Sequence, residues 1–436
     1  MAGGNWSTQN KVRPGAYINV QSNGMSISLG GARGTVAMPW MGGFGPVGEV
    51  IEITPSTNFI NVLGYEVGAP ELLTIREALK NASRLLITRV TSGASASVSA
   101  DELTITAKYP GSRGNDLSVQ VISDVDEAGV FLVNTFLDDM QVDSQRATNI
   151  ADLEDNAFVT FGGDGGLFPN AGLILSGGAD SPSTSLRLME FLEMMEAYDF
   201  NTMALPVEDN SIKMLGVAYI RRLREADGKK CQLVVAGINA DSEAVINVKN
   251  GVILADGTEV SADLATAWVA GATAGANVNE SNTYAIYTGA VNVTERYSNA
   301  EIVEALQRGQ FVFVEKRGEV IVEQDINSLV SFSAEKNQAF SKNRVMRVLD
   351  DIANTIKANF ASNFIGRVSN NEEGRNIFRA SVIEYMDSLQ RIGAVENFDA
   401  GDVLVHAGNH KDSVVAELRV QPTDAMEKLY MNVVVE

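Results

Sequence analysis

Few residues of this sequence are of the types that usually carry out catalysis. It contains two histidines, His406 and His410, which flank Ala407-Gly408-Asn409, and a single cysteine, Cys231, in the apolar run 231–237. A serine hydrolase with a doubly wound core needs an imidazole to accept the proton of its serine. Both histidines follow the part that alternates strands with helices, so we expect a strand end and a turn there. We predict a buried core thiol at Cys231 and no enzymatic activity.

Cofactor and metal motifs are incomplete or missing. Residues 43–48 formally match the dinucleotide fingerprint GxGxxG. However, Pro46 lies inside the match, and an alternating strand follows at 49–53, where pyrophosphate binding would need a helix N-terminus. Asp124 and Asp126 lack the further spaced ligands and the closing Glu of a calcium loop, which favours a solvated turn. Because no phosphate loop, CxxC or HExxH occurs either, we expect no cofactor and no metal.

Composition restricts the partners and the location. The chain has 436 residues, 45% of them hydrophobic and 20% charged, which is enough for several packed domains. No run approaches the roughly 18 apolar residues of a membrane span, and the N-terminus lacks the layout of a signal peptide, so we expect assembly in the cytoplasm. The formal net charge is -21. Nucleic acid and anionic membranes are therefore not expected as partners, because they require clustered Lys and Arg.

Apolar periodicity indicates a multidomain protein of the α/β and β classes. Short strands such as 103–107 and 117–122, separated by turn clusters, predict an inserted all-β module. Residues 171–330 alternate strands with helices, which is typical of crossover units on a largely parallel sheet. Two apolar helical stripes, at 345–360 and 378–389, are followed by two more strands and predict a C-terminal α+β domain.

Some local elements are predicted with more detail. The α/β part should begin with a strand at 173–175. An Ala- and Gly-rich helix at 260–275 opens with Ser261, and its small side chains would allow close packing with a neighbour. Residues 310–314 and 320–322 resemble the two strands of a hairpin.

Both ends of the chain predict strands. The C-terminal one alternates polar and apolar residues and comprises Leu429, Tyr430, Met431, Asn432, Val433, Val434 and Val435. A short N-terminal strand follows a turn and comprises Tyr17, Ile18, Asn19 and Val20. The C-terminal strand could be an ordinary last strand in its own domain. The alternative, which we favour, is that the terminal strands pair with neighbouring subunits.

One basic stretch stands out in this acidic chain. Residues 336–370 contain six basic side chains and two acidic ones, Asp350 and Asp351; the basic ones are Lys336, Lys342, Arg344, Arg347, Lys357 and Arg367. A solvated helix face would explain this composition. The functional interpretation is a docking face for an acidic partner surface, where charge complementarity would set the register.

Five stretches, in consistent order along almost the whole chain, carry a resemblance to a known family. They are 13–17 (RPGAY), 107–115 (AKYPGSRGN), 175–180 (LSGGAD), 323–329 (EQDINSL) and 424–431 (DAMEKLYM). The sequence thereby resembles the sheath protein of contractile phage tails, of the kind found in Gram-positive defective prophages and phage-tail-like bacteriocins. It departs at Ala16, where the family often has a bulkier aliphatic residue, and at Gly42-Gly43-Phe44, near a common Trp-Gly-Pro.

The resemblance implies a structural protein. It implies a subtilisin-like α/β core without a catalytic triad, an outward-facing β domain, and a C-terminal α+β domain against an inner tail tube. The terminal strands would link subunits into hexameric rings stacked as a helical sleeve, which contracts and drives the tube through a target envelope. Expected partners are further copies of the chain, the tube protein, the baseplate and the tail terminator. Assembly in the bacterial cytoplasm and release as part of a particle would follow, without membrane contact by the sheath.

The expected division of the chain follows these parts. It comprises an N-terminal arm at 1–30, core at 31–100, the β domain at 101–172, the α/β sheath domain at 173–332, the C-terminal domain at 333–424 and the linking strand at 425–436. The five candidate tube contacts are Lys336, Lys342, Arg344, Arg347 and Lys357. Two alternatives remain open: another self-assembling shell or layer protein, which would need no tube, and a hydrolytic or carbohydrate-binding α/β protein, which the histidine shortage disfavours.

Overall fold

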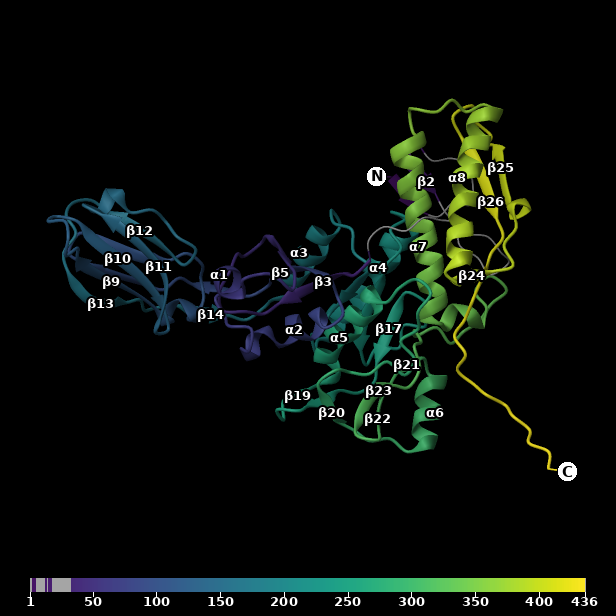
Figure 1. Cartoon of the computed structure of the whole chain (residues 1–436), viewed down its shortest axis with the longest axis horizontal. Helices are drawn as coiled ribbons and strands as arrows, with labels where there is room; N and C mark the ends of the chain where they lie inside the picture. Colours follow the sequence, from purple (N-terminus) through teal and green to yellow (C-terminus); the bar gives the residue numbers. More distant parts are fainter. Residues whose placement is uncertain (1, 5–11, 14, 18–32, 436) are drawn as a thin grey trace. The chain divides into compact units, whose positions relative to one another are not determined.

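Figure 1 shows the helices and strands of the chain and labels many of them. The structure is a computed structural model that describes residues 2–4, 12–13, 15–17 and 33–435. The chain divides into two compact units. One contains the described parts of Met1–Ala37, Glu77–Arg84 and Tyr198–Glu436, and the other contains Met38–Arg76 and Leu85–Ala197.

The α/β part is built on a seven-stranded sheet of order β21-β17-β16-β15-β3-β5-β4. Its strands are β3 (Thr35–Trp40), β4 (Val50–Ile53), β5 (Arg84–Arg89), β15 (Thr202–Ala204), β16 (Gln232–Ala236), β17 (Val245–Val248) and β21 (Gln310–Phe311). The run from β21 to β3 is parallel, whereas β4 and β5 pair antiparallel. The prediction of a largely parallel sheet is therefore confirmed, with an antiparallel edge strand.

Two helices cover the parallel strands in the first unit. α4 (Asn210–Glu225) and α5 (Ala262–Gly275) both contact β16, and side chains at their starts, including Ser261 for α5, accept hydrogen bonds from backbone N–H groups. α5 is buried along most of its length, as its Ala- and Gly-rich composition predicts. A Cβ atom at Gly271 would come within 2.3 Å of the carbonyl oxygen of Ala78. The small residue is therefore required for the close approach of the backbone at Ala78, near the end of α2 (Leu73–Leu79).

The second unit contains two antiparallel sheets, of orders β11-β10-β9-β13 and β12-β8-β7. Their strands are β7 (Ser97–Ala100), β8 (Leu103–Ala107), β9 (Leu117–Ser123), β10 (Phe131–Leu137), β11 (Met140–Ala147), β12 (Val159–Gly163) and β13 (Asn170–Ile174). Alternate residues of β9 are buried, namely Leu117, Val119 and Val121. This period of two buries one face of the strand, as the predicted all-β module requires.

The β module extends past the expected boundaries of 101–172 at both ends. β7 lies before residue 101, and β13 includes residues 173 and 174. The strand predicted at 173–175 was assigned to the α/β part, but β13 pairs antiparallel with β9 in the β module. A three-residue apolar run is too short to reveal the sheet to which it belongs.

The glycine-rich match at 43–48 is a loop followed by β4, so the prediction that it binds no dinucleotide phosphate is consistent with the local structure. The guanidinium of Arg89 donates hydrogen bonds of 2.7 Å to the carbonyl of Gly42 and 3.0 Å to that of Gly45. Gly45 has a φ of 104°, a conformation that favours glycine. The glycines therefore shape a loop around a buried arginine.

The second unit also contains β6 (Ser92–Ala94) and β14 (Ala179–Ser181), which pair with each other. Its helices include α1 (Phe59–Leu63) and α3 (Ser185–Met195).

Smaller sheets complete the α/β part of the first unit. They contain β18 (Val252–Leu254), β19 (Glu259–Val260), β20 (Ala290–Val293), β22 (Phe313–Lys316) and β23 (Glu319–Val322), near α6 (Asn299–Gln307). The predicted hairpin is confirmed only in part. β22 and β23 form it, whereas β21 pairs parallel with β17. The chain thus changes sheet at Val312, which the continuous apolar run 310–314 does not reveal.

The C-terminal part contains two long helices, α7 (Asn343–Asn359) and α8 (Glu372–Arg391), with a π turn at Phe360–Phe364. Both predicted apolar stripes contribute to one core cluster, which includes Val348, Ile352, Phe378, Val382 and Leu389. Two hairpin-like pairs follow, β24 (Val395–Glu396) with β27 (Gln421–Pro422) and β25 (Val403–Ala407) with β26 (Val414–Leu418). At the other end, β1 (Ala2–Gly4) pairs parallel with β2 (Gly15–Tyr17).

Candidate functional site

The two histidines and the cysteine lie in or beside strands of the fold. His406 lies in β25 and His410 in the turn before β26, as expected. Cys231 is buried just before β16, and burial raises the pKa of its thiol to about 12. No group of three or more His, Cys, Asp or Glu side chains in the described part of the chain could hold a metal ion. Among the described helices, none is both long and apolar enough to cross a membrane.

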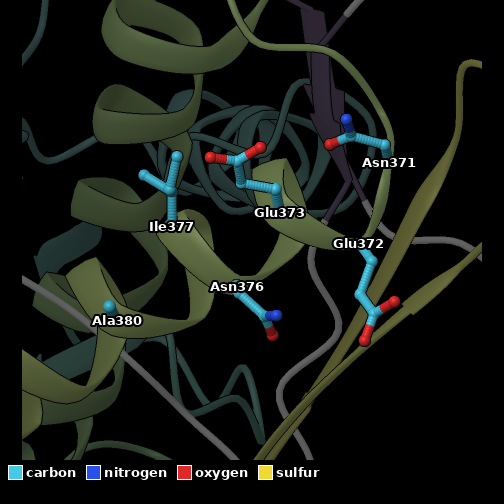
Figure 2. Close-up of a pocket in the computed structure, with 6 residues that line it drawn as sticks. All are labelled: Asn371, Glu372, Glu373, Asn376, Ile377 and Ala380. Carbon is cyan, nitrogen blue, oxygen red and sulfur yellow. The ribbon is translucent and has the colours of Figure 1, made fainter.

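An open pocket lies at the start of α8 (Figure 2). It is lined by Asn371, Glu372, Glu373, Asn376, Ile377 and Ala380. Asn371 caps the helix by accepting a hydrogen bond from the backbone N–H of Gly374. The two glutamates already place negative charge at the positive end of the helix dipole. They would repel an anionic ligand, so we assign no ligand to this pocket.

Each of the five predicted tube-contact cations has a partner within its own chain. The partners are Glu243 for Lys336, Glu427 for Lys342, the Thr423 carbonyl for Arg344, Asp325 for Arg347 and the Asp227 carbonyl for Lys357. Residues 343–353 of α7 are all buried. Lys336 is 42% exposed, whereas Arg344 and Arg347 are buried, so a solvated helix face does not describe these two arginines. The surrounding core loops supply the carboxylates and carbonyls that they need when buried.

Arg347 lies at the centre of a buried network. Its side chain has 0% exposure, as does that of Asp325, and the closest approach of the two charged groups is 3.5 Å. The guanidinium also donates hydrogen bonds to the carbonyls of Thr273 and Glu280. Asp325 accepts a further bond of 2.9 Å from Asn343. These bonds fix α7 against loops of the α/β core, because a buried charge without partners would be strongly destabilising.

A second buried ion pair joins α4 to α7. The two guanidinium Nη atoms of Arg224 donate hydrogen bonds of 2.6 and 2.8 Å to the carboxylate of Asp350. Their side chains are 8% and 9% exposed. Arg224 also donates to the carbonyl of Cys231. This paired geometry is the one in which Arg binds a carboxylate most strongly.

Lys230 next to this pair predicts a pH dependence of stability. Burial of the Lys230 ammonium lowers its pKa to about 8, and repulsion from Arg224 is the second largest cause of this shift. Between pH 7 and 9 the unfolded chain therefore holds a proton that the folded chain loses, so the free energy of unfolding should rise by about 1 kcal/mol. Urea titrations of the soluble subunit at these pH values would measure it. Lys230→Met should remove the rise, and an equal rise in that variant would contradict this assignment. The raised pKa of Cys231 acts in the opposite sense as the pH rises through the ordinary thiol pKa of 9.0, because the unfolded chain then loses a proton that the folded chain keeps.

The predicted C-terminal strand does not pair within the described chain. Residues 423–435 form no strand or helix, and the apolar side chains from Leu429 onward are open to solvent. Leu429, Tyr430 and Val435 are 84%, 89% and 90% exposed. The interpretation as an ordinary last strand in its own sheet is therefore wrong for the isolated subunit. This stretch, residues 428–435, is called the C-terminal arm below.

One carboxylate holds the chain just before the arm. Glu427 accepts hydrogen bonds from Thr283 at 2.8 Å and Gln324 at 2.6 Å, and forms an ion pair with Lys342. Its side chain is only 10% exposed. Sequence reasoning missed this contact, because the partners lie 144, 103 and 85 residues away along the chain. The only local signal was an acidic residue before an apolar terminal run.

The structure describes only part of the predicted N-terminal strand. Tyr17 ends β2, and its hydroxyl donates a 2.8 Å hydrogen bond to the carbonyl of Arg13. Ile18, Asn19 and Val20 lie outside the described residues. The described part of this strand therefore pairs with β1 of the same chain.

Models of phage tail sheath domains match the chain from residue 33 onward. They are the tail sheath protein Gp18 domain III N-terminal region at 33–90, the β-sandwich domain at 91–180, the central domain at 182–328 and the C-terminal domain at 335–436. The phage-like element PBSX protein XkdK of Bacillus subtilis (strain 168) is 37% identical over 463 residues, with 99% of each chain covered. The chain belongs to the phage tail sheath family.

Solved structures agree with this membership. The sheath tail protein from Desulfitobacterium hafniense has 43% identity and a TM-score of 0.85, covering 95% of this sheath protein and 99% of that chain. The helical sheath of the anti-feeding prophage in its contracted state has a TM-score of 0.58 at 12% identity, covering 99% of this chain and 100% of that chain. The latter likeness shows the fold alone.

The sheath protein is thus a structural subunit of a contractile tail or tail-like injection system, and its family is not enzymatic. The predicted family resemblance is confirmed. The alternatives of a hydrolytic, carbohydrate-binding or unrelated layer protein have no support from these matches. Its fold, a mixed parallel sheet with a β-sandwich domain and a C-terminal domain, is that of tail sheath structures.

Proposed function

We propose that the sheath protein joins its neighbours by donating its C-terminal arm as a strand to another subunit. The observation that carries the proposal is the extended, solvent-exposed and unpaired state of residues 428–435, whose side chains are typical of strands. In an isolated subunit, such a segment leaves its backbone groups without protein partners and its apolar side chains exposed to water. Pairing in a neighbour's sheet would satisfy both.

The β25–β26 hairpin is the acceptor that the fold favours. In the described chain these two strands pair only with each other, so each has an outer edge open to a third strand. Leu404 on β25 is 39% exposed and would be covered by an added strand. The N-terminal segment that contains Tyr17, Ile18, Asn19 and Val20 would add a further strand from another neighbour.

Strand exchange of this kind would build a helical sleeve of hexameric rings around an inner tail tube. The relative from the anti-feeding prophage was solved as a contracted helical sheath, and another structure with this fold, at 13% identity, belongs to the baseplate of the same particle. By analogy, the partners would be further copies of this chain, the tube, the baseplate and the tail terminator. Contraction would then move the tube through a target envelope. The core would be a subtilisin-like arrangement that lacks the triad.

The tube contact of the basic stretch stays a prediction, but the structure changes how it should be tested. Reversing Arg347 to Glu would bury a second negative charge beside Asp325 and unfold the subunit. Lys336 is 42% exposed and is the better probe. A Lys336→Glu variant that folds and forms sheath alone but fails to decorate tubes would support the contact.

Electron microscopy of the purified protein, alone and with its tube protein, tests the proposed function. We expect hollow striated tubes of uniform width, or ordered sleeves around the tube. Compact monomers under all conditions, with the tube protein present, would contradict polymerisation by this chain.

A further inference from the structure

Glu427 differs from the residues around it. Its side chain is 10% exposed, whereas Met426 on one side is 104% exposed and Leu429 on the other is 84% exposed. Among described residues 425–435, it is the one whose side chain receives hydrogen bonds from distant parts of the chain. A largely covered carboxylate thus separates the exposed Met426 from the exposed C-terminal arm.

The donors to Glu427 come from three separate elements of the first unit. Thr283 lies in the loop after α5, Gln324 follows β23, and Lys342 directly precedes α7. Burial alone would raise the pKa of Glu427, but hydrogen bonds from these three side chains outweigh it and leave the pKa below its ordinary value. The carboxylate is therefore ionised and fully engaged at neutral pH. We call Glu427 with these three donors the Glu427 clasp.

The clasp is continuous with the buried network around Arg347. The hydroxyl of Thr283 donates to Glu427 and accepts a 2.9 Å hydrogen bond from the backbone N–H of Asp325. The Asp325 carboxylate in turn binds Asn343 and Arg347 of α7. A pull on the arm would therefore act on the junction of α7 with the core.

We propose that Glu427 is the positioning residue that fixes the root of the C-terminal arm and so sets the length and direction of the inter-subunit tether. The inference rests on the proposed function of the arm. With the clasp closed, the free segment begins at Lys428. With the clasp open, the last ties are both at Thr423, whose N–H donates a 3.0 Å hydrogen bond to the Ala394 carbonyl and whose carbonyl accepts one of 2.6 Å from Arg344. Residues 424–427 would then add roughly 13 Å of reach.

Trypsin cleavage after Lys428 tests the clasp in the soluble full-length subunit. Lys342→Met removes the cation of the clasp and leaves the sequence around Lys428 unchanged. Because the protease needs an extended segment on both sides of the cleaved bond, we expect cleavage at this bond, followed by mass spectrometry, to be about tenfold faster in the variant. Gln324→Leu should act in the same direction.

Lys80→Met is the matched control. Lys80 is 25% exposed and pairs with the buried Glu77. Its replacement therefore also leaves a carboxylate without its cation, but Lys80 has no bond to the arm or to Glu427. Cleavage after Lys428 should keep the wild-type rate in this variant. Wild-type rates in both clasp variants would overturn the clasp, as would an equal acceleration in Lys80→Met.

Polymerisation of two variants distinguishes the role of Glu427 from the proposed strand donation. If deletion of residues 428–436 abolishes polymers, Lys342→Met should give polymers with irregular axial spacing, and regular wild-type spacing would overturn the role of Glu427 in positioning the tether. If the deletion variant polymerises normally, strand donation itself fails, and with it the tether role. The trypsin assay still decides, independently, whether Glu427 holds the root of the arm.

Discussion

A subunit that lacks residues 428–436 should remain folded and soluble but should form no sheath polymer. The side chains removed make no described contact with the core, and Leu429, Tyr430 and Val435 are 84%, 89% and 90% exposed. The thermal midpoint of the subunit should therefore stay within the range of ordinary surface changes. Polymerisation should be lost because the backbone hydrogen bonds of the donated strand go with it. Calorimetry and electron microscopy of the same preparation would measure both effects.

A pair of substitutions separates strand pairing from simple loss of apolar surface. Proline at positions 431 and 433 removes two backbone donors and resists incorporation into a sheet. Alanine at the same positions keeps both donors and shortens the side chains. We expect no polymers from the proline variant and reduced but detectable polymers from the alanine variant. Normal tubes from the proline variant would exclude strand donation by this arm.

Asp350→Ala should strongly destabilise the folded subunit. It leaves the guanidinium of Arg224 buried, with a side chain 8% exposed, and removes the carboxylate that lies 2.6 and 2.8 Å from its Nη atoms. Removing one partner of a buried ion pair costs about 3–5 kcal/mol. Urea unfolding of the soluble subunit, followed by tryptophan fluorescence, would measure the loss.

Two controls define the cause of that loss. Asp227→Ala breaks the pair of Arg222 with Asp227, whose side chains are 45% and 40% exposed, and should cost less than about 1 kcal/mol. Replacing both Arg224 and Asp350 by apolar residues of similar volume should recover much of the stability lost in Asp350→Ala. A double variant as unstable as the single one would show that packing, not the stranded charge, dominates.

The basic stretch illustrates what local composition cannot reveal. Between residues 336 and 370 the excess of Lys and Arg is evident, and both interpretations from sequence placed these side chains at a surface. The structure gives Arg347 and Arg344 buried positions instead, because loops from distant parts of the chain present carbonyls and carboxylates to α7. A cation with an internal partner and a cation for an external partner have the same sequence signature.

The sequence by itself determined the residue types and periods: no catalytic constellation, a β module, a parallel sheet with crossover helices, two C-terminal apolar helices and an apolar last segment. Motif order was also enough to indicate the family. These features are local, since a period of two or 3.6 residues is set by backbone geometry. Only the tertiary structure decided that β13 joins the β module, that α7 is fixed by buried ions and that Glu427 holds the arm. Those outcomes depend on partners up to 144 residues apart, which only the packing of distant elements brings together.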